Sequence, residues 1–112
     1  EIINIVRQGQ QNGETFVVTN GCFDILHVGH VRYLKKTKEC ADKLIVMLNS
    51  DISVKSIKGE NRPINCEEDR AEILSSLSCV DCILRILLQP NSIQSRRRIK
   101  EYSTKRWLYP GG

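Results

Sequence analysis

One segment of this 112-residue chain constrains its fold more than any other: a short apolar run that breaks at a glycine and continues as a helix. Residues 15–19 are rich in β-branched side chains, as expected of a buried strand. Gly21 ends this run, and residues 28–40 then carry apolar side chains at helical spacing, with lysines on the other face. The sequence therefore predicts a strand, a tight turn and a helix in direct succession.

Two more apolar runs complete an alternating pattern. Residues 43–48 and 80–84 are short, apolar and bounded by polar residues, so each predicts a strand. Between them, residues 52–64 predict a loop with at most one helical turn, and Asn65 is expected to cap a helix with Glu68 as its capping-box partner. Alternating strands and helices predict an α/β fold with right-handed crossovers and a parallel sheet covered on both faces. Ligands of such sheets bind beyond the carboxyl ends of the strands.

Two histidines stand at the predicted strand-to-helix turn. His27 and His30 are three residues apart, which puts both imidazoles on one side of the first helical turn. The helix N-terminus adds unpaired N–H groups and a positive dipole end, and Gly29 leaves room for an anion to approach the backbone. This arrangement favours a site that stabilises charge on a transferring phosphoryl group. Two surface histidines, or a metal pair without a third ligand, are the alternatives, and we expect no metal bound by the protein alone.

The residues of this turn also resemble a known family. Residues 19–30, Thr-Asn-Gly-Cys-Phe-Asp-Ile-Leu-His-Val-Gly-His, are similar to the signature of the cytidylyltransferase-like nucleotidyltransferases, in a form closest to the adenylyltransferase domain of bacterial ADP-heptose synthase. The resemblance covers about residues 15–84, and it implies a Rossmann-like nucleotidyltransferase fold. It also implies transfer of AMP from ATP, with Mg²⁺, to heptose 1-phosphate in surface-glycan synthesis. Residues 44–51, 53–54, 58–65, 69–70 and 79–81 support the same branch.

The resemblance also implies roles for individual residues. The expected catalytic residues are His27, His30 and Lys58. The expected nucleotide contacts are Asn20, Gly21, Cys22, Phe23, His27, Gly29 and His30. The expected contacts to the acceptor substrate are Asp24, Asn49, Asp51, Arg62 and Arg70.

Three of these residues have plausible structural roles instead. Asp24 could cap the helix that follows it. Lys58 could be a solvated loop lysine rather than a residue that closes over phosphates. Arg70 could pair with Glu67 or Asp69 on its own helix.

After residue 84 the family pattern disappears. Residues 85–112 carry seven basic side chains against one acidic, whereas residues 1–84 carry ten against twelve. The arginines at 96–98 could bind nucleic acid, but no aromatic residues are interleaved with them, and we expect no nucleic-acid partner. A shifted reading frame through residues 99–107 permits the Lys-Gly-Gly turn that the family normally has there. We therefore expect a fold that is incomplete at its C-terminal end, with an uncovered sheet edge that favours a homodimer.

These features predict three parts: a linker at 1–14, a domain core at 15–84 and an atypical basic tail at 85–112. Residues 1–13 resemble the linker that precedes this domain when it is fused to a sugar kinase. No apolar run is long enough to cross a membrane and no signal peptide is recognisable, so we expect a cytoplasmic fragment. Among five cysteines, Cys79 and Cys82 have the spacing of a metal or redox pair, but we favour thiols at the start of a buried strand.

Three rival functions remain at this level. The first is a cytidylyltransferase that acts on glycerol 3-phosphate or a similar alcohol phosphate. The second is a nucleotide-binding module that is inactive because its final motifs are missing. The third is a nucleic-acid binder that uses the basic tail.

Overall fold

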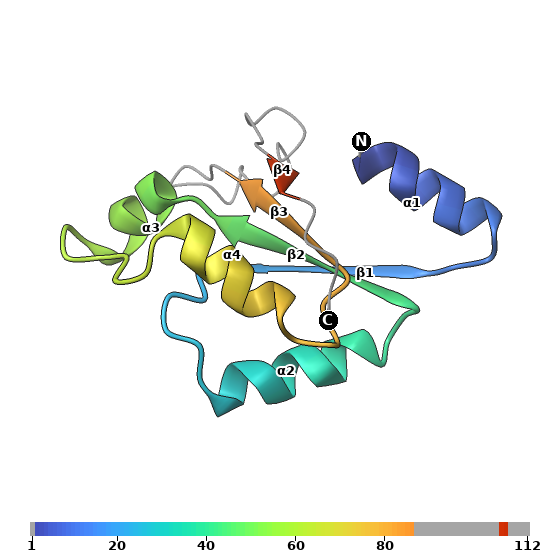
Figure 1. Ribbon diagram of the computed structural model, residues 1–112, viewed down its shortest axis with the longest axis horizontal. Coiled ribbons are helices and arrows are strands. Elements are labelled where there is room, and N and C mark those ends of the chain that lie inside the picture. The colour runs from blue at the N-terminus through green and yellow to red at the C-terminus, as the bar shows by residue number, and fades with distance from the viewer. Residues whose placement is uncertain (1, 87–105, 108–112) are drawn as a thin grey trace.

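The computed structural model describes residues 2–86 and 106–107, and these residues form an α/β fold (Figure 1). The predicted alternation of strands and helices is confirmed, with one helix preceding the first strand. The elements are α1 (Ile2–Gln11), β1 (Phe16–Gly21), α2 (Val28–Lys38), β2 (Lys43–Asn49), α3 (Asp51–Lys58), α4 (Glu67–Ser75), β3 (Cys82–Ile86) and β4 (Arg106–Trp107).

The strands lie in the order β1-β2-β3-β4. The first three are parallel, as predicted, whereas β4 pairs with β3 in the antiparallel direction. Val18 lies opposite Ile45, which in turn lies opposite Cys82, so the three parallel strands end together at one edge. The connections that follow β1 and β2 therefore meet at that edge.

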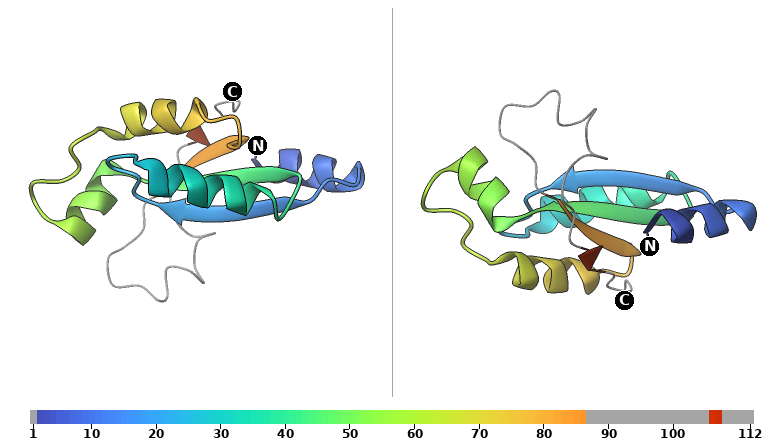
Figure 2. Two further views of the ribbon diagram at one scale, coloured as in Figure 1. Left: turned by 90° about the horizontal axis from the view of Figure 1, so that it is seen from below. Right: turned by 90° about the horizontal axis from the view of Figure 1, so that it is seen from above.

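Helices α2 and α4 both cover the same face of the sheet (Figure 2). Leu34 of α2 and Leu74 of α4 join one apolar core with Leu44, Val46 and Leu48 of β2, and all five are essentially inaccessible to solvent. Burying a side chain of this size contributes about 1.5–3 kcal/mol. This cluster is therefore the main attachment of both helices to the sheet.

The prediction that the crossovers cover both faces is wrong. The strand order advances in one direction from β1 to β3, and right-handed crossovers that advance in one direction place their helices on one side. Among the described residues, α1 borders the other face at the amino-terminal ends of the strands, where Ile5 and Gly9 line a cavity of about 430 Å³ together with Phe16. Further along that face, Val18 is 54% exposed.

Two local predictions are also wrong. Residues 51–58 form a complete helix, α3, because the Ser50 hydroxyl accepts a hydrogen bond from the Ser53 N–H at its start and Gly59, at φ 108°, ends it. The cap of α4 is Cys66 rather than Asn65, and it makes no side-chain capping bond. Asn65 instead makes hydrogen bonds to Asp24 in the turn after β1. The two residues are far apart in the sequence, so a local capping pattern could not indicate this contact.

Two carboxylates fasten the elements to one another. Asp81 accepts hydrogen bonds from Lys38 Nζ, at 2.5 Å, and from the Leu44 N–H, at 2.7 Å, and so joins the end of α2 to the start of β2. Glu67, at the start of α4, accepts a hydrogen bond from the Asp51 N–H at 2.8 Å and pairs with Arg85 of β3. The Asp81 contacts thus fix the amino-terminal edge of the sheet, and the Glu67 contacts fix its carboxyl edge.

Within residues 2–86, none of the helices has the length and apolar character that crossing a bilayer requires. Strand β3 runs to Ile86, two residues into the segment that was expected to be tail. The arginines at 96–98 lie outside the described residues. So do residues 99–105, which make up most of the segment 99–107 on which the reading-frame hypothesis depends.

Candidate active site

The turn between β1 and α2 is held in one shape by a buried aromatic ring. Phe23 has a φ of 47°, in the left-handed region that non-glycine residues rarely adopt, and its side chain is buried. A Cβ at Gly21 would lie 2.7 Å from Cε2 of this ring. Gly21 is therefore required because the Phe23 ring occupies the space that a side chain would need.

The two histidines cap helix α2 reciprocally. His27 is the N-cap residue and accepts a hydrogen bond at Nδ1 from the Gly29 N–H, at 3.0 Å. His30 Nδ1 accepts a hydrogen bond from the His27 N–H, at 3.2 Å. The rings are stacked, with centroids 3.9 Å apart and planes at 29°. The predicted placement of both imidazoles on one side of the first turn is thus what the structure has.

This capping pattern assigns the protonation of both rings. A backbone N–H donates to each Nδ1, so Nδ1 must carry a lone pair and the proton of the neutral ring is on Nε2. Burial lowers the pKa of His30 below its ordinary value of 6.5, and the proximity of His27 and Lys58 lowers it further. His30 is therefore a neutral imidazole near pH 7 that donates from Nε2.

Gly29 has a role that the sequence did not indicate. A Cβ at this position would lie 2.8 Å from His27 Cε1 and 3.0 Å from its Nδ1. The space beside Gly29 is therefore filled by the His27 ring, and Gly29 is not among the residues that line the adjoining cavity.

That cavity, called the histidine cavity below, has a volume of about 530 Å³ and opens at the carboxyl end of β1. Its lining comes from the end of β1 and the turn after it, from one stripe of α2, and from the end of α3 and the segment that follows. The lining residues are Asn20, Gly21, Cys22, Phe23, Asp24, Ile25, His27, His30, Tyr33, Lys58 and Arg62. The structure thus brings together all three expected catalytic residues and most of the expected nucleotide contacts.

Ile25 and Tyr33 line the cavity although the sequence did not single them out. Tyr33 is three residues beyond His30, so the spacing that aligns the histidines also places it on their stripe of α2. Its hydroxyl is 2.7 Å from the Thr19 hydroxyl of β1 and shares a hydrogen bond with it. The helical spacing could have identified Tyr33, whereas nothing in the sequence pointed to Ile25.

Asp24 is buried and bonds the loop that precedes α4. Its carboxylate accepts hydrogen bonds from the N–H groups of Ile64 and Asn65, at 2.9 Å, and from Arg62 Nε, at 2.5 Å. Burial opposes ionisation of Asp24, but the donors at Asn65, Ile64 and Arg62 outweigh it and hold the pKa below the ordinary value of 3.8. The alternative that Asp24 caps α2 is wrong, because His27 is the cap.

Arg70 is buried and joins the segments around the site. Its guanidinium donates to the carbonyl oxygens of Cys22 and Asn49 at 2.8 Å and of Asn65 at 2.9 Å, and to Asp51 Oδ1 at 2.7 Å. The alternative that Arg70 pairs within its own helix is wrong, because its ion-pair partner is Asp51 of α3. Arg70 does not line the histidine cavity. Its hydrogen bonds join the carboxyl ends of β1 and β2 to each other.

The remaining expected residues are divided between core and surface. Asn49 is buried beside Ser53, and Asp51 faces a neighbouring cavity rather than the histidine cavity.

Burial raises the pKa of the Cys22 thiol above its ordinary value of 9.0, although Lys58 and Arg70 act in the opposite direction. Cys22 is thus a neutral thiol near pH 7, which disfavours a role as nucleophile.

Comparison with known proteins gives one family and several relatives. The model of the family described as cytidylyltransferase-like matches residues 18–108. The chain is 58% identical over 83 residues to the bifunctional protein HldE of Wolinella succinogenes, and 55% identical over 84 residues to that of a Nitratiruptor species. These matches cover 74% and 75% of this chain but 18% of each relative, so the chain spans less than a fifth of their length.

A solved structure is similar as well. It is the crystal structure of a lipopolysaccharide core biosynthesis protein from Thermoplasma volcanium, with a TM-score of 0.58 and 32% sequence identity. The match covers 79% of this chain and 68% of that protein.

Proposed function

The chain belongs to the cytidylyltransferase-like family, and from this premise we propose that it transfers AMP from ATP to the phosphate of a sugar 1-phosphate. One observation carries the proposal. Two stacked imidazoles accept backbone N–H hydrogen bonds at Nδ1, and this leaves two Nε2–H donors at the N-terminus of α2. Donors fixed before the substrate arrives stabilise developing negative charge without reorganising.

The charges around the histidine cavity suit a polyphosphate. Lys58 and Arg62 line it from the side of α3, and Asp24 is the carboxylate among its lining residues. Because Asp24 is already bonded to Arg62 and to two backbone N–H groups, it adds little free negative charge. The terminal nitrogens of Arg62 and the ammonium of Lys58 are then available to phosphate oxygens.

The reaction requires no covalent intermediate with the protein. A phosphate oxygen of the acceptor forms a bond to the α-phosphorus of ATP, the bond from that phosphorus to the α,β-bridging oxygen breaks, and pyrophosphate leaves with the electron pair. His27 and His30 would donate to the oxygens that gain charge. Lys58 would hold the triphosphate against them, and positioning of this kind accounts for most of catalysis in phosphoryl transfer.

Magnesium fits this site as part of the nucleotide rather than as a resident ion. Among the described residues there is no group of three or more His, Cys, Asp or Glu side chains that could hold a metal. Mg²⁺ is commonly bound by one or two carboxylates together with substrate phosphates and water. We therefore propose that it enters with ATP and supplies charge neutralisation to the phosphates.

Heptose 1-phosphate is the acceptor that we propose. The resemblance of residues 19–30 to the adenylyltransferase domain of ADP-heptose synthase supports it. Similarity to the HldE proteins and to a lipopolysaccharide core biosynthesis protein points the same way. Because the HldE relatives are bifunctional and much longer than this chain, we also propose that the chain is one part of a larger protein that carries a sugar kinase.

Pyrophosphate release tests the proposal directly. The chain is incubated with Mg²⁺, either ATP or CTP, and either heptose 1-phosphate or glycerol 3-phosphate. We expect release with ATP and heptose 1-phosphate above the other three combinations. A preference for CTP and glycerol 3-phosphate would replace the proposal by its cytidylyltransferase rival, and ATP binding without turnover in any combination would indicate a non-catalytic module.

A histidine variant tests the mechanism. His30→Ala removes one Nε2–H donor, and losing one preorganised donor of this kind costs about 10²–10³-fold in kcat. Arg32→Ala is the matched control, because Arg32 is an exposed residue on the same helix and does not line the cavity. Full activity in His30→Ala, with an unchanged circular dichroism spectrum, would remove the mechanism.

A further inference from the structure

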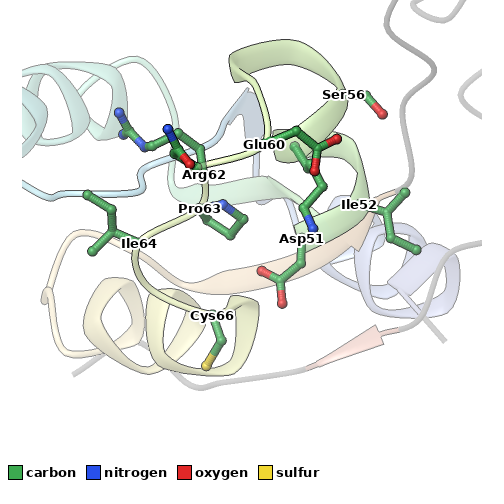
Figure 3. A pocket seen from close by; sticks show the side chains of 10 residues that line it. Asp51, Ile52, Ser56, Glu60, Arg62, Pro63, Ile64 and Cys66 are labelled. Carbon is green, nitrogen blue, oxygen red and sulfur yellow. The ribbon is translucent and has the colours of Figure 1, made fainter.

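A second cavity, called the α3 cavity below, lies beside the histidine cavity. It has a volume of about 510 Å³ and opens between helix α3 and the segment from residue 60 to residue 66 (Figure 3). Its size is in the range of cavities that hold small molecules. The residues on which its character depends are Ile52, Lys55 and Ser56 from α3, and Glu60, Ile64 and Cys66 from the other wall.

The α3 cavity differs from the histidine cavity in its charge. Asp51 and Glu60 balance Lys55 and Arg62, so its formal charge is zero. Exposed apolar side chains stand among these polar groups, with Ile52 and Ile64 at 71% and 62% exposure. Carboxylates that accept hydroxyl hydrogen bonds, interspersed with apolar surface that packs on C–H groups, suit an uncharged polyhydroxylated ligand better than a polyphosphate.

The two cavities share one wall. Arg62 lines both of them, and the Asp24 carboxylate in the active-site turn holds its Nε at 2.5 Å. Asp24 also bonds the N–H groups of Ile64 and Asn65, so the wall of the α3 cavity is fastened to the turn that carries the histidines. A ligand in the α3 cavity therefore lies at a fixed distance from the phosphate site.

From this juxtaposition, and resting on the function proposed above, we propose that the α3 cavity binds the polyhydroxylated portion of the sugar-phosphate acceptor, with the acceptor's phosphate at Arg62. In an in-line displacement the attacking and leaving oxygens stand on opposite sides of the α-phosphorus. With the leaving pyrophosphate at His27 and His30, we place the acceptor's phosphate at Arg62, because Arg62 lines both cavities.

The position of Cys66 allows a binding test that does not need turnover. Cys66 is an exposed free thiol that lines the α3 cavity, whereas Cys40 is an exposed free thiol outside both cavities. Alkylation by iodoacetamide is followed at each cysteine by peptide mass spectrometry, so Cys40 is the internal control. At a ligand concentration ten times the dissociation constant, bound ligand should slow alkylation of Cys66 about tenfold.

Four probes separate the sources of any protection. We expect heptose 1-phosphate to slow alkylation of Cys66 but not of Cys40. Inorganic phosphate, glycerol 3-phosphate and ATP should leave both rates unchanged. Equal protection by inorganic phosphate or glycerol 3-phosphate would overturn the assignment of a sugar site, and so would a rate that heptose 1-phosphate leaves unchanged.

Two tryptophan variants test the same cavity by kinetics. Ile52→Trp fills the α3 cavity from an exposed position on α3, and Ile57→Trp is its control, an exposed isoleucine of the same helix that lines neither cavity. We expect Ile52→Trp to raise the KM for heptose 1-phosphate at least tenfold with the KM for ATP unchanged, and Ile57→Trp to change neither.

If pyrophosphate is released but Ile52→Trp behaves like Ile57→Trp, the acceptor lies elsewhere and only this inference fails. If no pyrophosphate is released while heptose 1-phosphate protects Cys66, the sugar site stands and the proposed reaction fails.

Discussion

Replacing Arg70 by methionine should lower the stability of the whole domain rather than only weaken the binding of a ligand. Methionine has a similar length but no donors, so the variant loses every hydrogen bond that the guanidinium makes. Three main-chain carbonyl oxygens, at Cys22, Asn49 and Asn65, lose a partner. The fourth acceptor, Asp51, is 38% exposed and can be hydrated, so we assign it no energy.

The size of the effect follows from these three carbonyls. A buried acceptor left without a partner costs about 1–3 kcal/mol. Two of the three bonds are only partly buried, which puts each of those near the lower end of the range. The sum is about 3–5 kcal/mol. Domains are stable by only about 5–15 kcal/mol in total, so the loss is a large fraction of what holds this fold together.

Urea unfolding followed by circular dichroism at 25 °C measures the difference. Arg32→Met is the control, because Arg32 is exposed on α2 and should change the free energy of unfolding by less than about 0.5 kcal/mol. Arg70→Lys keeps the charge but not the planar set of donors, so we expect a smaller loss that remains measurable if Arg70→Met does not fold. A loss below 1 kcal/mol in Arg70→Met, accompanied by weaker acceptor binding, would show that Arg70 is a substrate contact and refute the reasoning.

Two further predictions concern the turn. Gly29→Ala places a Cβ 2.8 Å from His27 Cε1 and should displace that ring, lowering kcat/KM by about tenfold or more. Because the same ring caps α2, the variant should also lose about 0.5–2 kcal/mol of stability. Wild-type kinetics in this variant would mean that the ring position is unimportant. The depressed pKa of Asp24 contributes stability that is present above pH 3.8 and is lost as the pH falls through the folded-state value. The difference in unfolding free energy between the wild type and Asp24→Asn should therefore shrink between pH 5 and pH 2. A pH-independent difference would contradict this.

The site was predictable from the sequence where its chemistry is local. His27 and His30 act within one helical turn, so their spacing alone placed them on one side of a helix N-terminus. The apolar runs likewise predicted three parallel strands and the edge at which the site opens. Helix α3 was missed because its residues are mostly polar and the Ser50 cap and Gly59 end are weak signals when read alone.

What the sequence by itself determined, then, was the strand–turn–helix, the parallel order and the paired imidazoles, because each depends on residues close together in the chain. Tertiary structure decided how the remaining residues are used. Asp24 meets Arg62 across 38 residues, and Arg70 meets Cys22 across 48. Such contacts form only once the sheet has brought distant segments to one edge. A buried charged group must be paired or hydrogen-bonded, so its partners are the groups that lie at that edge. The same folding step fastened the two cavities to a common wall, which no local pattern in the sequence records.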